Sequence, residues 1–244
     1  MRVPDRARRA GAVLRRPDLV LRHHGHEVWC PLCRVRFRSF KDDWNRPNAL
    51  CWLCGSHERH RAQWLLFDER PELFAGRRAL LHFAPEYCLR TRLTRVAKRH
   101  AIRYDTGDLD PTGVDLQLDI TALALPDAAY DAVLCSHVLE HVEDDRAALR
   151  ELRRVTARDG WCLVMVPLDT GREQTYEDPA ITTPEQRRVA YWQEDHVRLY
   201  GRDVVDRIAA SGFAVEVIRP REAFGDETMR RARLLDSDWI LLCR

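Results

Sequence analysis

Four of the eight cysteines form two pairs whose spacing suits a metal ion. Cys30 and Cys33 make one C-x2-C pair, Cys51 and Cys54 make a second, and seventeen residues separate the pairs. A C-x2-C turn directs two thiolates at one ion, so two such turns predict a tetrahedral four-cysteine zinc site. Four protein ligands leave no open coordination position, and we therefore expect a structural Zn2+. A disulfide framework, which needs an oxidising compartment, and buried free thiols are the alternatives.

Acidic and histidine side chains follow several short apolar stretches in the rest of the chain. Asp108 ends one such stretch, Asp119 ends the next, and His137 directly follows a third. Because ligands of parallel sheets bind at the carboxyl ends of the strands, we expect these three residues at one ligand-binding edge. An Asp at a strand end is also a common turn former, and that interpretation stays open for each Asp by itself.

The pattern of apolar residues predicts strands that alternate with helices around these residues. We expect strands over residues 78–83, 102–109, 114–120, 130–136, 161–167, 214–218 and 239–243. A helix is expected after the first strand, another opens at Asp144, and a third covers 201–210. Asp159-Gly160 is expected to close the connection before the fifth strand. This spacing predicts an α/β fold with a doubly wound parallel sheet.

The second, third and fourth of these strands carry motifs that resemble a known enzyme family. Residues 130–142 (YDAVLCSHVLEHV) resemble the fourth-strand motif of class I S-adenosylmethionine (SAM)-dependent methyltransferases. Residues 107–111 (GDLDP) resemble the second-strand motif, and Asp119-Ile120 followed by Leu125-Pro126 resembles the third. The resemblance covers roughly residues 77–244. It implies a Rossmann-like, seven-stranded sheet, SAM as the cofactor and methyl transfer as the activity.

A narrower resemblance links the chain to a bacterial subgroup with an N-terminal four-cysteine zinc knuckle. It rests on residues 54–61 (CGSHERHR), 81–86 (LHFAPE) and 195–201 (DHVRLYG). In the wider family, the second-strand acid hydrogen-bonds the ribose hydroxyls and the third-strand acid meets the adenine amino group. The resemblance therefore implies a SAM site made of Phe83, Ala84, Pro85, Glu86, Asp108, Asp119, Ile120, Ser136 and His137.

The loop after the first strand departs from the family pattern. The family has a glycine-rich loop there, which lets the backbone approach the methionine part of SAM, whereas this chain has Ala84-Pro85-Glu86. Pro85 has no N–H to donate. Ala84 is small enough for a close approach, and Glu86 is expected to hold the ammonium group of the cofactor. The departure leaves a non-catalytic scaffold with a degenerate methyltransferase fold as an alternative.

Methyl transfer from a sulfonium requires an aligned nucleophile, and a hydroxyl nucleophile also requires a general base. The candidate bases are His137, His141 and His196, each of which is also open to interpretation as a surface or capping residue. The residues expected to contact the acceptor are Tyr176, Asp195, His196 and Arg198. They lie in or after a long polar loop, 169–183, which is typical of a lid or substrate loop. Its charges favour a small polar acceptor with a hydroxyl or amine, such as a sugar or natural-product scaffold.

Composition and charge limit the class of partner. The chain has 244 residues and a net charge of +2. The expected organisation is an Arg-rich flexible arm (1–26), a zinc-ribbon module (27–58) and a methyltransferase domain (59–244). Without a membrane-spanning run or a signal peptide, a cytoplasmic protein is expected. An RNA methyltransferase that holds RNA with the zinc ribbon is the second hypothesis, although the near-zero net charge disfavours it. The oligomeric state stays open.

Overall fold

The computed structural model of the chain describes residues 16–44 and 46–244. They divide into two compact units. The described residues of unit 1 are 16–44, 46–71, 86–93 and 220–236, and those of unit 2 are 72–85, 94–219 and 237–244. Most of the expected Arg-rich arm, including Arg2, Arg6, Arg8, Arg9 and Arg15, lies outside the described residues. No helix in the described ranges is long and apolar enough to cross a membrane.

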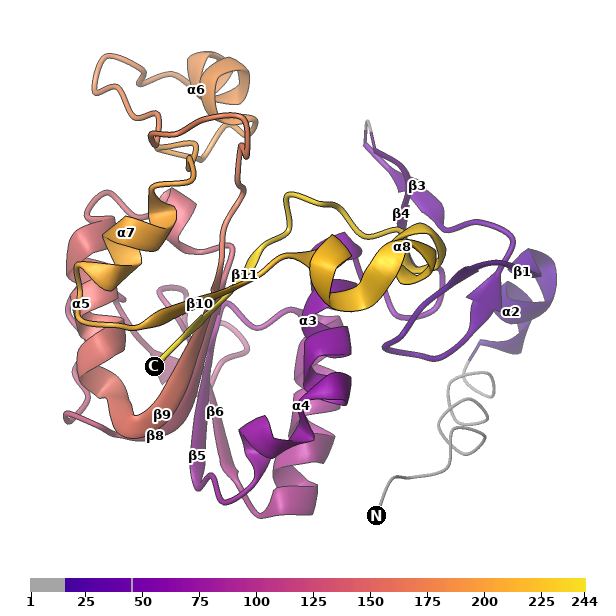
Figure 1. Cartoon of the computed structure of the whole chain (residues 1–244), viewed down its shortest axis with the longest axis horizontal. Helices are drawn as coiled ribbons and strands as arrows, with labels where there is room; N and C mark the ends of the chain where they lie inside the picture. The colour runs from indigo at the N-terminus through magenta and orange to yellow at the C-terminus, as the bar shows by residue number, and fades with distance from the viewer. Residues whose placement is uncertain (1–15, 45) are drawn as a thin grey trace. The chain divides into compact units, whose positions relative to one another are not determined.

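Unit 1 is built from short antiparallel strand pairs and helices (Figure 1). Strand β1 pairs with β2, and β3 pairs with β4. Helix α8, which contacts β1 and α3, is interrupted at Gly225, where φ is 74°. The bounds of its elements are α2 (Pro17–His23), β1 (His24–Trp29), β2 (Arg36–Phe37), β3 (Lys41–Asp43), β4 (Arg46–Leu50), α3 (Glu58–Glu69) and α8 (Pro220–Ala232). The short helix η1 (Pro71–Phe74) and helix α4 (Tyr87–His100) continue from unit 1 into unit 2.

Unit 2 contains a seven-stranded sheet, as the sequence predicts. The strand order is β10-β11-β9-β8-β5-β6-β7, and β11 runs antiparallel to both of its neighbours while the other pairs are parallel. The strands are β5 (Ala79–Phe83), β6 (Arg103–Asp108), β7 (Leu116–Gln117), β8 (Tyr130–Ser136), β9 (Thr156–Met165), β10 (Val215–Ile218) and β11 (Ile240–Cys243). The helices wholly within this unit are η2 (Leu139–His141), α5 (Asp145–Val155), α6 (Pro184–Tyr191) and α7 (Val204–Ala209). The α/β fold class is therefore confirmed.

The strand order reverses between β5 and β8. From β5 the chain adds β6 and β7 on one side, and then adds β8 and β9 on the other. Helices α5 and α7 contact each other and cover one face of the sheet, where the apolar core of the unit lies (Figure 1). Such a reversal opens a space at the carboxyl ends of the two central strands, and ligands of doubly wound sheets bind there. Residues that follow β5 and β8 are consequently the first candidates for a site.

Two expected boundaries in the sheet are wrong, for local reasons. The third strand covers only Leu116–Gln117 rather than 114–120, because Asp119 turns the chain by accepting hydrogen bonds from the backbone N–H (2.8 Å) and hydroxyl (2.7 Å) of Thr121. Asp159-Gly160 lies inside β9 instead of closing the connection before it. A Cβ at Gly160 would lie 2.7 Å from the carbonyl oxygen of Asp131, so the glycine permits the close approach of β9 to β8. Gly160 is therefore a strand glycine and not the loop glycine that the sequence pattern predicts.

Candidate functional site

The four predicted zinc ligands come together in unit 1. The four sulfur atoms lie within 4.8 Å of one another. The separation is 3.5 Å between Cys30 and Cys54 and 3.7 Å between Cys33 and Cys51. Sulfur atoms around one tetrahedral zinc ion lie about 3.8 Å apart, because each Zn–S bond is about 2.3 Å long. All four are free thiols, and the cluster has the size and donor set of a four-cysteine zinc site.

The two C-x2-C pairs adopt matching turns. The amide of Cys30 donates to the carbonyl of Val35 (3.0 Å), and the amide of Cys51 donates to the carbonyl of Ser56 (3.0 Å). The residue after the second cysteine of each pair is left-handed, with φ of 61° at Arg34 and 66° at Gly55. A left-handed residue ends the turn and leaves both thiolates on its inner side. The structure thus repeats one zinc-knuckle geometry twice.

A buried arginine fixes the second knuckle within unit 1. Arg61, in α3, is fully buried and donates to the carbonyl oxygens of Ala49 (2.8 Å), Ser56 (2.5 Å) and Ala232 (2.6 Å). Its guanidinium also stacks on the ring of Phe40, 4.4 Å from the centroid. Arg61 is the last residue of the run 54–61, and from the sequence this run was known only as part of a family resemblance. The contacts give Arg61 a structural role.

In unit 2, the loop after β5 keeps a backbone conformation that glycine favours, although the glycine is absent. Ala84 has φ of 44°, and its amide donates to the carbonyl of Gly107 at the end of β6 (2.9 Å). Phe83 is buried at the strand end, and Pro85 follows with partial exposure. The small side chain of Ala84 permits the turn at a cost of about 1–2 kcal/mol for an L-residue. Alanine therefore replaces the glycine of the family pattern, and the turn is kept.

The positive φ of Ala84 predicts how substitutions at this position change stability. Ala84→Val is expected to lower the free energy of unfolding by about 1–3 kcal/mol, because a β-branched side chain is strongly disfavoured at positive φ. Ala84→Gly, the matched control, is expected to unfold at the same or a higher urea concentration than the wild type. Urea unfolding followed by circular dichroism measures both. A valine variant as stable as the glycine variant would contradict the strained turn.

The two predicted acids lie at the ends of neighbouring strands. Asp108 is the last residue of β6, is partly exposed, and accepts a hydrogen bond from the amide of Asp110 (3.1 Å). Asp119 follows β7 and is exposed, while Ile120 beside it is buried. The hydrogen bonds from Thr121 lower the pKa of Asp119, so the carboxylate is ionised. Both acids form local turns, which is the alternative interpretation given for each Asp in the sequence. Both also lie at the carboxyl edge of the sheet.

At the end of β8, a histidine and a buried glutamate form a pair. Ser136 is buried, and His137 follows with φ of 55°, a second left-handed non-glycine residue at this edge. Nδ1 of His137 lies 3.1 Å from Oε1 of Glu140, whose side chain is 1% exposed. Burial by itself would raise the pKa of Glu140, but the His137 imidazole outweighs it and the pKa lies below its ordinary value. Glu140 lies in the LEH run of residues 139–141, and the sequence alone did not mark it as a site residue.

The other two candidate histidines contact each other. The rings of His141 and His196 lie 4.8 Å apart in an edge-to-face arrangement. Nδ1 of His141 lies 3.3 Å from Oδ2 of Asp195, and Nδ1 of His196 donates to the carbonyl oxygen of Tyr191 (2.9 Å). Burial lowers the pKa of His196, which favours the neutral imidazole. The structure therefore gathers all three predicted bases around η2.

Arg198 is buried, whereas the sequence predicts it in an open polar loop. It is 4% exposed, and its guanidinium donates to the carbonyls of Leu139 (3.0 Å), Val142 and Glu143 (2.8 Å) and to the carboxylate of Glu177 (2.9 Å). Contacts of this kind position the η2 turn. Direct contact between Arg198 and an acceptor stays a prediction.

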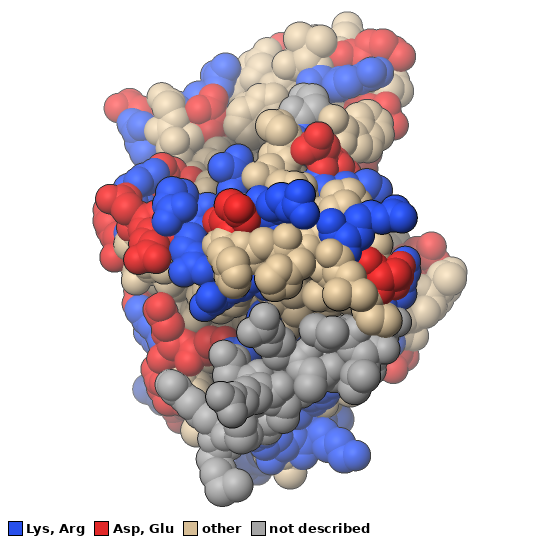
Figure 2. All heavy atoms as spheres, turned by 90° about the vertical axis from the view of Figure 1, so that its right-hand side faces the viewer, with Lys and Arg blue, Asp and Glu red and all other residues tan. Residues whose placement is uncertain are grey.

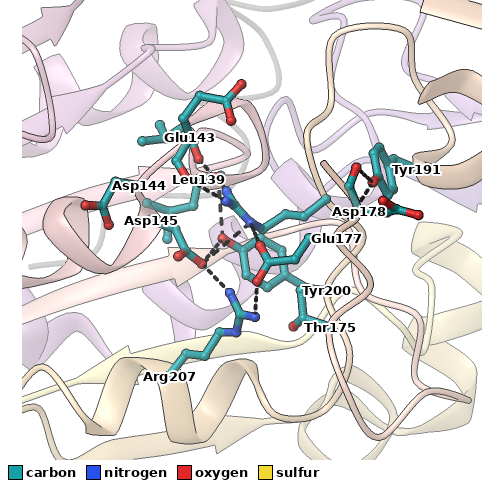
Figure 3. Close-up of polar contacts among 12 residues, drawn as sticks. Leu139, Glu143, Asp144, Asp145, Thr175, Glu177, Asp178, Tyr191, Tyr200 and Arg207 are labelled. Carbon is teal, nitrogen blue, oxygen red and sulfur yellow. Dashed lines mark hydrogen bonds and ion pairs between the residues drawn. The ribbon is translucent and has the colours of Figure 1, made fainter. Parts of the chain in front are cut away.

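Arg198 belongs to a largely buried network of charges with Asp145, Glu177 and Arg207, all three of which Figure 3 labels. Asp145 accepts hydrogen bonds from the hydroxyl of Tyr200 (2.8 Å) and from Arg207 (3.0 Å), and Arg207 also donates to Glu177 (2.7 Å). Two carboxylates thus face two guanidinium groups. Burial, together with the Asp145 carboxylate, raises the pKa of Tyr200 well above its ordinary value, so its hydroxyl remains a donor. Spacing in the sequence carries no sign of this network.

Of the remaining predicted site residues, Tyr176 lies in unit 2 and Glu86 lies in unit 1. Tyr176 is partly exposed in unit 2, pairs with Leu199 through two backbone hydrogen bonds, and packs on the ring of Tyr191 at 5.6 Å. Figure 1 shows this segment and α6 beyond the carboxyl edge of the sheet. Glu86 belongs to unit 1, where its carboxylate lies 3.0 Å from Nε2 of His60. Its expected role toward an ammonium group stays a prediction.

The surface drawn in Figure 2 mixes both signs of charge. Lys and Arg side chains alternate there with Asp and Glu side chains. Within unit 1, a hollow of about 450 Å³ is likewise lined by both signs, among them Arg46, Glu58, Arg221 and Asp226. None of the residues expected to bind SAM lines this hollow. A surface built for nucleic-acid phosphates would be predominantly basic.

Comparison with known proteins gives a family and a fold. Residues 87–164 match the methyltransferase domain family. No curated protein sequence matches the chain. Among solved structures, the [4+2]-cyclase SpnF is similar with a TM-score of 0.53 and 15% identity, over 97% of this chain and 96% of that one. A SAM-dependent methyltransferase from Archaeoglobus fulgidus has a TM-score of 0.49 and 16% identity, over 78% of this chain and 94% of that one.

A third similar structure is 1,6-didemethyltoxoflavin-N1-methyltransferase from Burkholderia thailandensis, with bound S-adenosylhomocysteine. Its TM-score is 0.49 at 15% identity, and the alignment covers 76% of each chain. Identities this low speak to the fold alone. The family match runs from α4 to β9 and so spans both sides of the reversal in strand order. The match identifies a methyltransferase domain over residues 87–164, within the seven-stranded sheet of unit 2.

Proposed function

We propose that the carboxyl edge of unit 2 binds SAM and transfers its methyl group to a hydroxyl or amine of a small polar acceptor. The observation that carries the proposal is that Asp108, Asp119 and His137 lie at the carboxyl ends of β6, β7 and β8, on both sides of the reversal between β5 and β8. Ligands of such sheets bind at this place. The left-handed turn at Ala84 supports the proposal over a degenerate scaffold, since it retains the backbone conformation that glycine favours.

The residues present fit the cofactor by their chemistry. Carboxylates at Asp108 and Asp119 suit the ribose hydroxyls and the adenine amino group, and Phe83, Ile120 and Ser136 line the strand ends beside them. Bound SAM supplies an electrophilic methyl group on a sulfonium, and the chain supplies alignment.

His137 is the proposed general base for a hydroxyl acceptor. Its Nδ1 faces the ionised carboxylate of Glu140, which favours a proton on that nitrogen and leaves Nε2 with a lone pair. Nε2 makes no hydrogen bond to the described protein. An imidazole oriented by a carboxylate is a common base arrangement. A proton taken from the acceptor would therefore reside on Nε2 of His137.

The acceptor side of the proposal rests on polar groups from one segment. Asp195 is exposed and lies beside His141 of η2, and Tyr176 is partly exposed. Neutral polar groups and single charges suit a hydroxylated small molecule. RNA is the less favoured acceptor, because the net charge is +2 and the face in Figure 2 mixes both signs. The cysteine site would hold structural Zn2+ with no part in the chemistry.

Binding of S-adenosylhomocysteine tests the proposal. Zinc-loaded wild-type protein is expected to bind it in calorimetry, and Asp108→Ala is expected to weaken binding about 10- to 100-fold, because one charged hydrogen-bond acceptor contributes about 1.5–3 kcal/mol. Asp127→Ala, which removes an 81% exposed acid elsewhere in unit 2, serves as the control with unchanged affinity. Absence of binding by folded wild-type protein would refute the cofactor site.

A further inference from the structure

Three side chains at the carboxyl edge of unit 2 are arranged as ligands for one metal ion. Each of Glu140, His141 and His196 offers an oxygen or nitrogen atom within 4.8 Å of the other two. Ligand atoms on one zinc-sized ion lie about 3 to 4 Å apart, because each bond is about 2.0–2.2 Å long. The separation of these three atoms is thus close to that of ligands around one ion.

Both histidines have one ring nitrogen engaged and the other available. Nδ1 of His196 donates to the carbonyl of Tyr191, so Nε2 carries the lone pair, and this buried Nε2 has no hydrogen-bond partner in the described chain. The Asp195 carboxylate, 3.3 Å from Nδ1 of His141, favours the same tautomer there. Metal-binding histidines almost always give their second N–H to a carbonyl or carboxylate in this way. The pattern is thus that of two ligands with their outer partners in place.

Glu140 supplies the anionic ligand. Its side chain is 1% exposed, and neither carboxylate oxygen accepts a hydrogen bond of good geometry from the described residues, even with His137 at ion-pair distance. A buried carboxylate in this state is costly unless another charge or donor satisfies it. Packing of the two rings would explain His141 and His196, but it leaves the carboxylate of Glu140 with only the ion-pair contact to His137 among the described residues. A cation bound by all three satisfies the oxygens and the free Nε2 together.

The two segments that carry these ligands are fixed to each other. The amide of Val197 donates to the carbonyl of Glu140 (2.8 Å), and Arg198 binds carbonyls on either side of it in the chain. The ligand-bearing turn is therefore held before any ion arrives, as a preorganised site requires. The side chain of His141 is 37% exposed and gives an ion a route from solvent.

We infer that Glu140, His141 and His196 form a second metal site, separate in composition from the four cysteines, for a divalent transition-metal ion. Two imidazoles and one carboxylate suit Fe2+, Co2+, Ni2+ or Zn2+, whereas Mg2+ and Ca2+ prefer all-oxygen sites. Three protein ligands leave coordination positions open. An oxygen atom of the methyl acceptor could occupy one of these open positions. This last step rests on the proposed methyl transfer.

Calorimetric titration of the zinc-loaded full chain with Co2+, in the absence of SAM, tests the site. The wild type is expected to bind one Co2+ whose absorption lacks sulfur-to-cobalt charge transfer. Glu140→Gln and His196→Ala are expected to weaken binding by more than about 100-fold, and Asp195→Asn, which removes an outer partner, by about 10- to 100-fold. Glu143→Gln, the same change at an 83% exposed residue three positions on, is expected to leave affinity unchanged.

Two results would overturn the inference. The first is that the wild type binds no Co2+ outside the cysteine cluster, so that every bound Co2+ shows sulfur-to-cobalt charge transfer. The second is that Glu140→Gln and His196→Ala both bind Co2+ with the affinity of the wild type. Circular dichroism checks that these variants fold, and if they do not, Asp195→Asn decides, because its side chain is 63% exposed. S-adenosylhomocysteine binding without Co2+ binding refutes the metal site alone. Co2+ binding without S-adenosylhomocysteine binding refutes only the proposed function.

Discussion

Replacing Cys51 by Ser is expected to release zinc and to unfold the strand pairs of unit 1. Binding of structural zinc contributes about 10–16 kcal/mol in small zinc modules, which equals or exceeds the whole stability of a typical domain. The strands β1 to β4 are two to six residues long, too short to compensate by burial. Zinc content by elemental analysis and near-ultraviolet circular dichroism measure the two effects.

Cys243→Ala is the matched control for the zinc prediction. Cys243 is a buried thiol in β11 of unit 2, outside the cysteine cluster. Its loss should leave the zinc content unchanged and cost only the packing of one small side chain. Wild-type protein that retains its circular dichroism and its melting temperature after zinc is removed by a chelator would contradict a structural role for the metal.

Arg198→Ala is expected to lower the free energy of unfolding of unit 2 by about 3–5 kcal/mol, the range for breaking a buried ion pair from one side. The substitution leaves two carboxylates, Asp145 and Glu177, with one guanidinium, that of Arg207. It also removes the guanidinium donor from the carbonyls of Leu139 and Glu143. Urea unfolding gives the free energy. Arg198→Lys should recover only part of it, because an ammonium group cannot match the planar fork of a guanidinium.

Arg188→Ala provides the comparison on the same segment. Its side chain is 55% exposed, and its nearest acid, Glu194, lies 4.0 Å away. Exposed pairs of this kind contribute less than about 1 kcal/mol. Equal losses in the two variants would show that the buried network of Arg198 contributes no more than an exposed pair.

The sequence by itself determined the elements whose signals are local. The run 130–136 is mostly apolar and was expected as a strand, and β8 has the same bounds, Tyr130–Ser136. Asp144 was expected to open a helix, and its side chain accepts from the amide of Ala147 (2.8 Å) at the start of α5. The cysteine spacing predicted a cluster that the fold brings together. Each signal consists of residues within a few positions of one another, where backbone geometry and side-chain type decide the outcome.

Only the tertiary structure decided which distant groups meet. Glu140 and His196 are 56 positions apart in the sequence, and their proximity depends on a backbone hydrogen bond and on Arg198, which looked like an exposed loop residue. The left-handed turn at Ala84 was likewise invisible, because alanine carries no signature of positive φ. Helix α8 interrupts the sequence of unit 2 yet contacts α3 and β1 of unit 1. Burial, the charge of the neighbours and long-range hydrogen bonds set these features, and none of them is a property of a short stretch of sequence.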